Sequence, residues 1–165
     1  MDRRYPPKRT RKQSKRDSKI AERVIYLTDV LGDEEQALSF FMENQWRLSD
    51  SCYWQILRSL WIACGSQENI KDFKVLFNRK RSFQFHFMTP SDEATLKKLP
   101  AEIELYRAIT GDDDCGISWT SSLEVAERFA EAQCRQIIKK VFKKKDIFAF
   151  LNSRNEHEFI IWGGE

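Results

Sequence analysis

The sequence has no long apolar run and no apolar stretch after its basic N-terminus. A membrane-spanning helix needs about 18 or more consecutive apolar residues, and no segment approaches that length. A secretory signal would place an apolar stretch directly behind the basic residues, and none follows them. We therefore expect a soluble, cytoplasmic protein with no membrane partner.

The sequence also has few residues that bind zinc. Its four cysteines, at positions 52, 64, 115 and 134, are widely separated, and the chain holds only two histidines. No C-x-x-C pair is present, so the pattern predicts neither a zinc site nor any other metal site. We predict that the four cysteines are free thiols in a reducing compartment, and disulfides are the alternative.

Positive charge is concentrated at the N-terminus. Residues 1–24 hold ten Lys or Arg against three acidic residues, so they carry +7, and because the whole chain carries +3 the remainder carries −4. Residues 1–19, "MDRRYPPKRTRKQSKRDSK", have too few aliphatic side chains to bury and are predicted to form a flexible basic arm. Such an arm either contacts nucleic acid or serves solubility.

The remaining residues, 20–165, are predicted to form one α+β domain. Apolar residues make up 41% of the chain and aromatics 13%, enough to fill a core. Residues 20–80 read as helices, with Asp33 as a helix start and Gly65 as a stop, and residues 81–165 read as mainly β. Phe83, Phe85 and Phe87 alternate with polar residues, which predicts a strand on which His86 is structural.

Three separated segments carry residues suited to chemistry. "IELYRAIT" (103–110) reads as a strand with Arg107 near its end, and alone Arg107 would be a surface ion-pair residue. "GISWTSSLEVAERFA" (116–130) places Ser118 and Thr120 on one face of a strand. A capping box formed by Ser121 and Glu124 then predicts a helix.

The third segment, "SRNEHEFII" (153–161), sets two glutamates close together. Asn152 to Asn155 read as a loop, and a period of two places Glu156 and Glu158 on one face of the following strand. Like charges on one face repel each other. A lysine from "IIKKVFKKK" (137–145) on a neighbouring strand is able to neutralise them, which is the alternative to a functional role.

In their order and separation, these three segments resemble the ADP-ribosyltransferases of the Arg-Ser-Glu type, a group with many bacterial toxins and phage-encoded enzymes. The resemblance covers about sixty C-terminal residues, through "YRAIT", "GISWTSSLEVAERFA" and "EHEFII". It implies N-terminal helices followed by an ADP-ribosyltransferase-like mixed β core. It also implies NAD as a substrate, with no metal, and transfer of ADP-ribose to a macromolecule.

The resemblance assigns a role to each residue that matches the family pattern. Glu158 is the catalytic glutamate expected to bind the ribose 2′-hydroxyl, and Glu156 orients the acceptor or takes its proton. Arg107 is expected to bind the phosphate side of NAD, and Ser118 to hold the catalytic glutamate, with Thr120 closing the triplet.

The sequence departs from the family pattern at the serine triplet, and it does not single out the aromatic residue that stacks on nicotinamide. Trp119 stands where the family has a small hydroxyl residue, and the run Thr120 to Ser122 is a second candidate for the triplet. In the family, aromatic residues usually stack on nicotinamide. Four residues are candidates for this role, and the alternative for each is that it packs in the hydrophobic core: Tyr106, Trp119, Phe129 and Phe150.

The acceptor has several candidates. In the family, a glutamate at the position of Glu156 often accompanies arginine as the acceptor, so the resemblance favours protein arginine, whereas the basic arm favours RNA or DNA. The alternatives to transfer are an NAD glycohydrolase, which uses water, and a non-enzymatic nucleic-acid-binding protein. A toxin-like or phage-borne role, with an inhibitor or antitoxin protein as partner, follows by analogy alone.

Overall fold

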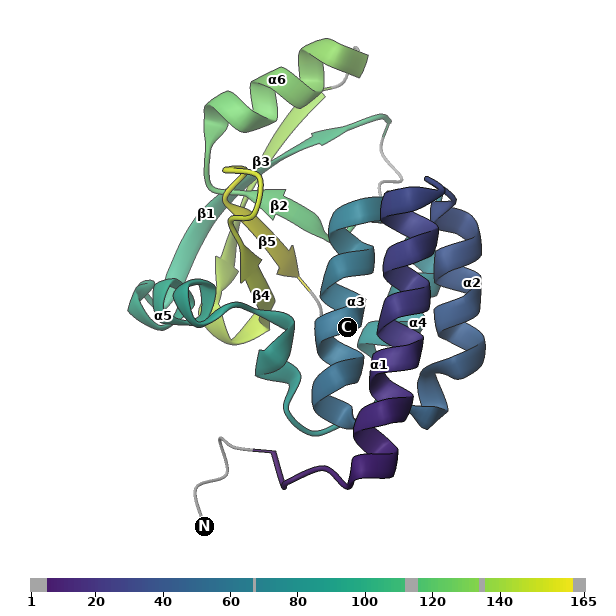
Figure 1. The fold of residues 1–165 in the computed structure, drawn as a ribbon. Coiled ribbons are helices and arrows are strands. Elements are labelled where there is room, and N and C mark those ends of the chain that lie inside the picture. Colours follow the sequence, from purple (N-terminus) through teal and green to yellow (C-terminus); the bar gives the residue numbers. More distant parts are fainter. Residues whose placement is uncertain (1–5, 67, 112–115, 134–135, 162–165) are drawn as a thin grey trace. The chain divides into compact units, whose positions relative to one another are not determined.

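The structure, a computed structural model, describes residues 6–66, 68–111, 116–133 and 136–161 of the 165-residue chain. The fold is α+β, with helices first and a sheet after them, as the sequence predicted (Figure 1). The chain divides into two compact units, Met1–Phe87 and Met88–Glu165. Among the described residues, no helix is both long enough and apolar enough to cross a membrane.

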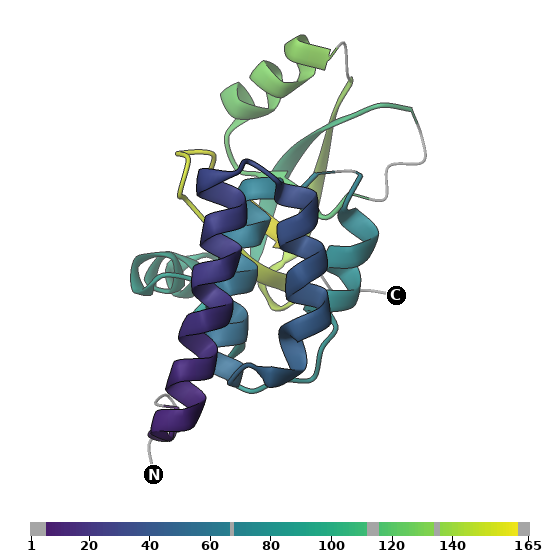
Figure 2. The ribbon, with the colours of Figure 1, turned by 45° about the vertical axis from the view of Figure 1, so that its right-hand side comes forward.

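The first unit is helical. Figures 1 and 2 show α1, α2 and α3 packed side by side. Tyr53 and Trp54 of α3 are fully buried in its core, and Phe41 of α2 packs against Tyr53 with ring centroids 5.3 Å apart. Its elements are α1 (Arg11–Ile25), η1 (Tyr26–Val30), α2 (Glu34–Asn44), η2 (Gln45–Arg47), α3 (Asp50–Cys64), α4 (Ile70–Phe77) and η3 (Gln84–Phe87).

Two helix boundaries confirm the sequence prediction. The Asp33 side chain accepts a hydrogen bond from the Gln36 amide (2.9 Å), which starts α2. Helix α3 ends at Cys64, and the amide of Gly65 donates to the Trp61 carbonyl as its cap. Asp33 and Gly65 therefore predicted the start of α2 and the end of α3 correctly.

The prediction of a flexible arm over residues 1–19 is wrong from Arg11 onward, because α1 begins there. Residues 1–5 lie outside the described residues. Thr10 caps the helix by accepting a hydrogen bond from the Gln13 amide (3.2 Å), and Ile20 and Val24 are buried. The helix thus packs one narrow side against the helical unit, and most of its basic residues are exposed on the other sides.

Asp17 fastens α1 to the start of α3. Its carboxylate accepts bonds from the Ser49 amide (3.0 Å) and hydroxyl (2.6 Å), from Arg9 (2.9 Å) and from Gln13 (2.7 Å). Burial alone would raise the pKa of Asp17, but these hydrogen bonds outweigh it and hold the pKa below its ordinary value of 3.8.

We expect Asp17→Asn to destabilise the protein by about 2 kcal/mol at pH 7, because the charged acceptor is lost from a buried site. A carboxylate whose folded pKa is depressed stabilises the protein above its unfolded pKa, and this stability disappears as the pH falls through the folded pKa. Urea unfolding of both proteins between pH 7 and pH 3 should show the difference shrinking toward acid. Glu43→Gln, an exposed change on α2, is the control, and a difference independent of pH would contradict the role of Asp17.

The strand predicted at Phe83, Phe85 and Phe87 is also wrong, since residues 84–87 form the 3-10 helix η3. Phe83 has a left-handed backbone (φ 61°), which interrupts any extended run, and Phe87 is fully buried. His86 Nδ1 lies 2.5 Å from Ser51 Oγ, so the prediction of a structural histidine is confirmed.

Cys52 and Cys64 are free and buried in α3, and Cys115 and Cys134 lie outside the described residues. Burial raises the pKa of each described thiol to about 11. We expect iodoacetamide at pH 8 to modify both at least about 100-fold more slowly in the native protein than in denaturant, because the thiolate is the reactive form. Peptide mass mapping over time measures this, and rapid native labelling of either peptide would contradict it.

The second unit is a five-stranded sheet with helices. Its elements are α5 (Pro90–Lys98), β1 (Glu102–Ile109), β2 (Ser118–Thr120), α6 (Leu123–Gln133), β3 (Gln136–Lys143), η4 (Lys144–Asp146), β4 (Ile147–Leu151) and β5 (Glu158–Ile161). The strand order is β3-β1-β2-β5-β4. Every pairing among the described strands is antiparallel, so the predicted mixed sheet is not what forms here.

The register aligns one row of residues across the sheet. Tyr106 of β1 lies opposite Thr120 of β2, and Thr120 lies opposite Glu158 of β5. Residues directly opposite each other point to the same face, so these three side chains share a face. The alternate residues Trp119 and Phe159, also opposite each other, belong to the apolar core of this unit.

Candidate active site

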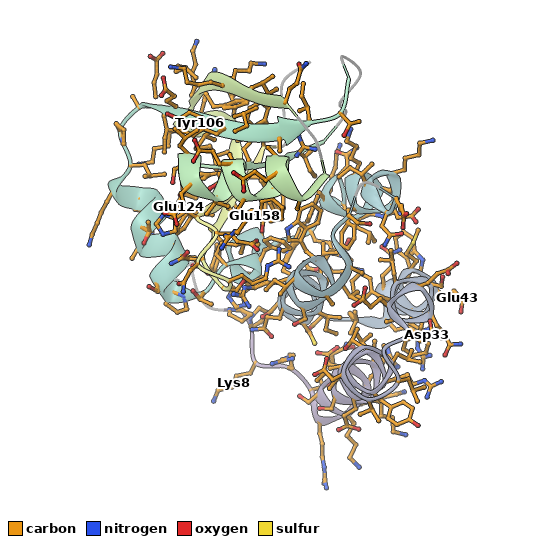
Figure 3. All side chains as sticks on the ribbon, turned by 90° about the horizontal axis from the view of Figure 1, so that it is seen from above. Lys8, Asp33, Glu43, Tyr106, Glu124 and Glu158 are labelled. Atoms are coloured by element: carbon orange, nitrogen blue, oxygen red, sulfur yellow. The ribbon has the colours of Figure 1, made fainter. Side chains whose placement is uncertain are left out.

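Three strands that are neighbours in the sheet bring together residues that are far apart in the sequence. β1 carries Arg107, β2 carries Ser118, and β5 begins with Glu158. Hydrogen bonds link the three residues in that order. Figure 3 shows Glu158 within the sheet unit, on the row that also contains Tyr106.

Glu158 is a buried carboxylate with a fixed partner. Glu158 is only 7% exposed. Ser118 Oγ donates a hydrogen bond of 2.5 Å to Glu158 Oε1. A charged acceptor with a hydroxyl donor forms a short, strong bond, which fixes the direction of the carboxylate. The residue pair that the sequence placed together is therefore together in the fold.

Arg107 supports the strand that carries Ser118. Its Nη1 donates to the Ser118 carbonyl oxygen, so the guanidinium holds the backbone of β2 at the point where the hydroxyl is presented. The guanidinium lies against Gly116, where a β-carbon would overlap it. Only glycine leaves this space, which explains the residue type at position 116.

Thr120 has a structural role on the same strand. Its buried hydroxyl donates to the Glu156 carbonyl (2.7 Å) and accepts from the Ser122 amide (3.0 Å). The first bond ties the approach to β5 against β2. The second begins the turn into α6.

The two candidate triplets differ in what their hydroxyls contact. Ser118 reaches Glu158, whereas Ser122 caps α6 by accepting from the Val125 amide (3.3 Å). Ser122, not Ser121, therefore caps the helix, and because the residue three positions on is Val125, which has no side-chain acceptor, the predicted capping box of Ser121 and Glu124 is wrong. The triplet of Ser118 to Thr120 is the one that meets the glutamate.

Glu156 lies in the loop before β5, not on the strand, so its predicted strand alternation with Glu158 is wrong. Asn155 (φ 54°) and His157 (φ 47°) have left-handed backbones, which end the extended conformation on both sides of Glu156. Arg154 Nε and Nη2 each lie 2.9 Å from Glu156 Oε2. The second glutamate is therefore held by a neighbour in its own loop.

No lysine of "IIKKVFKKK" lies on a strand beside β5 in the described sheet. β3, which carries most of this segment, pairs with β1 at one edge, and β5 pairs with β2 and β4. Lys139 instead pairs with Glu104, with Nζ 3.1 Å from Oε2. Neutralisation of the two glutamates across strands, the alternative suggested by the sequence, does not occur in this sheet.

The aromatic candidates lie in different surroundings. Tyr106 shares the face of Glu158, but its hydroxyl donates to Glu104 Oε1 (2.7 Å), a bond that lowers the pKa of Glu104 and raises the pKa of Tyr106. Trp119 is buried in the core and packs against Phe142, with ring centroids 4.7 Å apart. Phe150 is also core, whereas Phe129 on α6 is 41% exposed.

Sequence reasoning missed two residues of this group, Gly116 and the ion-pairing role of Arg154. A glycine before a short polar strand is visible in the sequence, but its role depends on the Arg107 guanidinium that packs against it.

A pocket of about 390 Å³ in this unit contains none of the predicted site residues; it is lined by Lys140, Val141, Phe142, Lys143, Lys145, Asp146 and Ile161.

Comparison with known proteins adds no further assignment: no model of a protein family, no curated protein and no solved structure matches this chain.

Proposed function

We propose that the protein is an NAD-dependent mono-ADP-ribosyltransferase that transfers ADP-ribose to a macromolecular acceptor, most readily a protein arginine. The observation that carries the proposal is the linked series Arg107, Ser118 and Glu158 on three adjacent strands. The hydrogen bonds between these residues support the roles that the family resemblance implies for them. A buried carboxylate fixed by a serine hydroxyl is costly to maintain without a use.

Glu158 would stabilise the transition state of bond cleavage. The bond between ribose C1′ and the nicotinamide nitrogen breaks, nicotinamide leaves with the bonding electrons, and the ribose becomes an electron-poor oxocarbenium-like ring. A fixed carboxylate beside the ribose 2′-hydroxyl lowers the energy of that charge. The 2.5 Å bond from Ser118 to Oε1 supplies the fixed direction of the carboxylate.

Arg107 would act in two ways. Its bond to the Ser118 carbonyl positions the serine, and a guanidinium presents its five N–H donors in a planar fork that suits anionic oxygens. Phosphate oxygens of NAD suit this planar fork better than they suit a lysine ammonium. The contact with Gly116 fixes where the fork lies.

Glu156 would receive the proton of the acceptor. An arginine nitrogen attacks C1′ as the nicotinamide bond breaks, a C–N bond forms, and the displaced proton moves to the Glu156 carboxylate. The same carboxylate is already bound by the guanidinium of Arg154 at 2.9 Å, so the site accepts this chemical group. An acceptor arginine would compete with Arg154 for it.

We expect Glu156→Gln to lower transfer to protein by about 100-fold, because the general base is removed, while nicotinamide release from NAD continues with water as the acceptor. Transfer of labelled ADP-ribose to lysate protein and release of nicotinamide are measured in parallel. Arg154→Gln is the matched change in the same loop and should preserve transfer. Loss of both readings in Glu156→Gln would contradict separate roles for the two glutamates.

Labelled NAD incubated with the protein and a whole-cell lysate tests the function itself. Label that is released by protease but resists nuclease means transfer to protein, and the reverse means transfer to nucleic acid. Label recovered only as free ADP-ribose means that the protein is an NAD glycohydrolase. Unchanged NAD under all conditions would contradict the proposal and favour a non-enzymatic role.

A further inference from the structure

One side of α1 is a continuous cationic surface. Lys12, Lys15, Lys19 and Arg23 follow helical spacings of three and four residues, and all four are exposed. We call these four residues the basic face of α1. The packing side, with Asp17, Ile20 and Val24 buried, occupies a different part of the helix circumference.

The basic face of α1 makes no ion pair with the residues that the structure describes. Among the described residues, no carboxylate oxygen lies within 4.0 Å of a side-chain nitrogen of these four residues. Glu22 is the one exposed carboxylate of α1, and Asp17 is buried and paired with Arg9. A helix made soluble by charge usually alternates signs at i and i+4, which this face does not do.

The dimensions of the basic face suit a nucleic-acid backbone. From Lys12 to Arg23 the helix rises about 16 Å, because each residue adds about 1.5 Å. One strand of a duplex carries a phosphate about every 3.4 Å, so the face runs beside about five phosphates. Lys8, which precedes α1, projects away from the helices and extends the positive charge (Figure 3).

The composition of this region favours a duplex over a single strand. Binding of single strands relies on aromatic side chains that stack on bases, and none lies between Lys12 and Arg23; the ring of Tyr26, just beyond them, lies against the Arg23 guanidinium, with Cζ 5.4 Å from the ring centroid. Lysines on a regular helix contact phosphates without reading bases. We propose that the basic face of α1 binds the phosphate backbone of double-stranded nucleic acid without sequence preference, independently of NAD.

Fluorescence anisotropy with a labelled 20-base-pair duplex of random sequence tests this interaction in the full chain. The triple variant Lys12→Gln, Lys15→Gln, Lys19→Gln should bind at least about tenfold more weakly, and its slope of log K against log salt should be shallower by about 3. The control changes three exposed lysines outside α1 by the same total charge: Lys71→Gln, Lys80→Gln and Lys98→Gln.

The outcomes separate the basic face from general attraction by net charge. Equal losses in the triple variant and the control, or no loss in either, would overturn the proposal, as would tighter binding to single strands than to duplexes. Duplex DNA and duplex RNA in separate titrations identify which backbone is preferred, and circular dichroism verifies that each variant is helical. Glu158→Gln should bind the duplex normally, so the result does not depend on the enzymatic assignment.

Discussion

Glu158→Gln is expected to slow nicotinamide release from NAD by about 100-fold or more, the cost of removing a preorganised electrostatic group. Glutamine has nearly the same shape, and its carbonyl oxygen is still able to accept the hydroxyl of Ser118, so the sheet should remain intact. The negative charge beside the ribose is lost. The measurement is the initial rate of nicotinamide release at saturating NAD.

Glu102→Gln is the matched control for this change, since Glu102 is an exposed glutamate on β1 of the same unit. Its rate should equal that of the unchanged protein. Thermal unfolding of both variants distinguishes lost chemistry from lost structure. Equal rates for Glu158→Gln and the unchanged protein, with both folded, would remove Glu158 from the mechanism.

Gly116→Ala is expected to lower nicotinamide release by about 100-fold, although residue 116 carries no functional side chain. The added methyl group would occupy the position of the Arg107 guanidinium, which must leave the Ser118 carbonyl. Displacement of a positioned group by about 1 Å is enough for such a loss. Because the guanidinium ends a flexible side chain, the free energy of unfolding should fall by only about 1 kcal/mol.

A double-mutant cycle tests whether Gly116 acts through Arg107. Arg107→Ala removes the group that the methyl displaces, so Gly116→Ala should have almost no further effect on the rate in that background. Four proteins are compared: the unchanged chain, each single variant and the double variant. Independent, additive losses in the double variant would show that Gly116 has another role.

The residues of the candidate site could be predicted from the sequence, but their geometry could be predicted only in part. The order of the motifs predicts that Ser118 contacts Glu158, and a hydrogen bond joins them. A period of two through residues 156–158 predicts that Glu156 lies on the strand, whereas it lies in the preceding loop. Asn155 and His157 interrupt that period with left-handed backbones; among residues other than glycine, Asn and His favour this conformation, but it is uncommon even for them, so residue type gives only a weak signal.

Tertiary packing explains the other differences. The basic composition of residues 11–19 predicted an arm, yet Ile20, Val24 and Asp17 attach the same segment to the helical unit. A few buried contacts were enough to order a helix that its composition alone would not stabilise. Likewise, alternation at Phe83, Phe85 and Phe87 indicated a strand, whereas burial of Phe87 beside Phe77 accompanies a single helical turn.

The most direct measurement is the release of nicotinamide from NAD by the purified protein, with and without a lysate as the source of acceptors. If Glu158 and its partners form an NAD site, nicotinamide should accumulate over many turnovers, faster with lysate, and Glu158→Gln should remove nearly all of it. A folded protein that leaves NAD intact in both conditions would contradict the proposed enzymatic function.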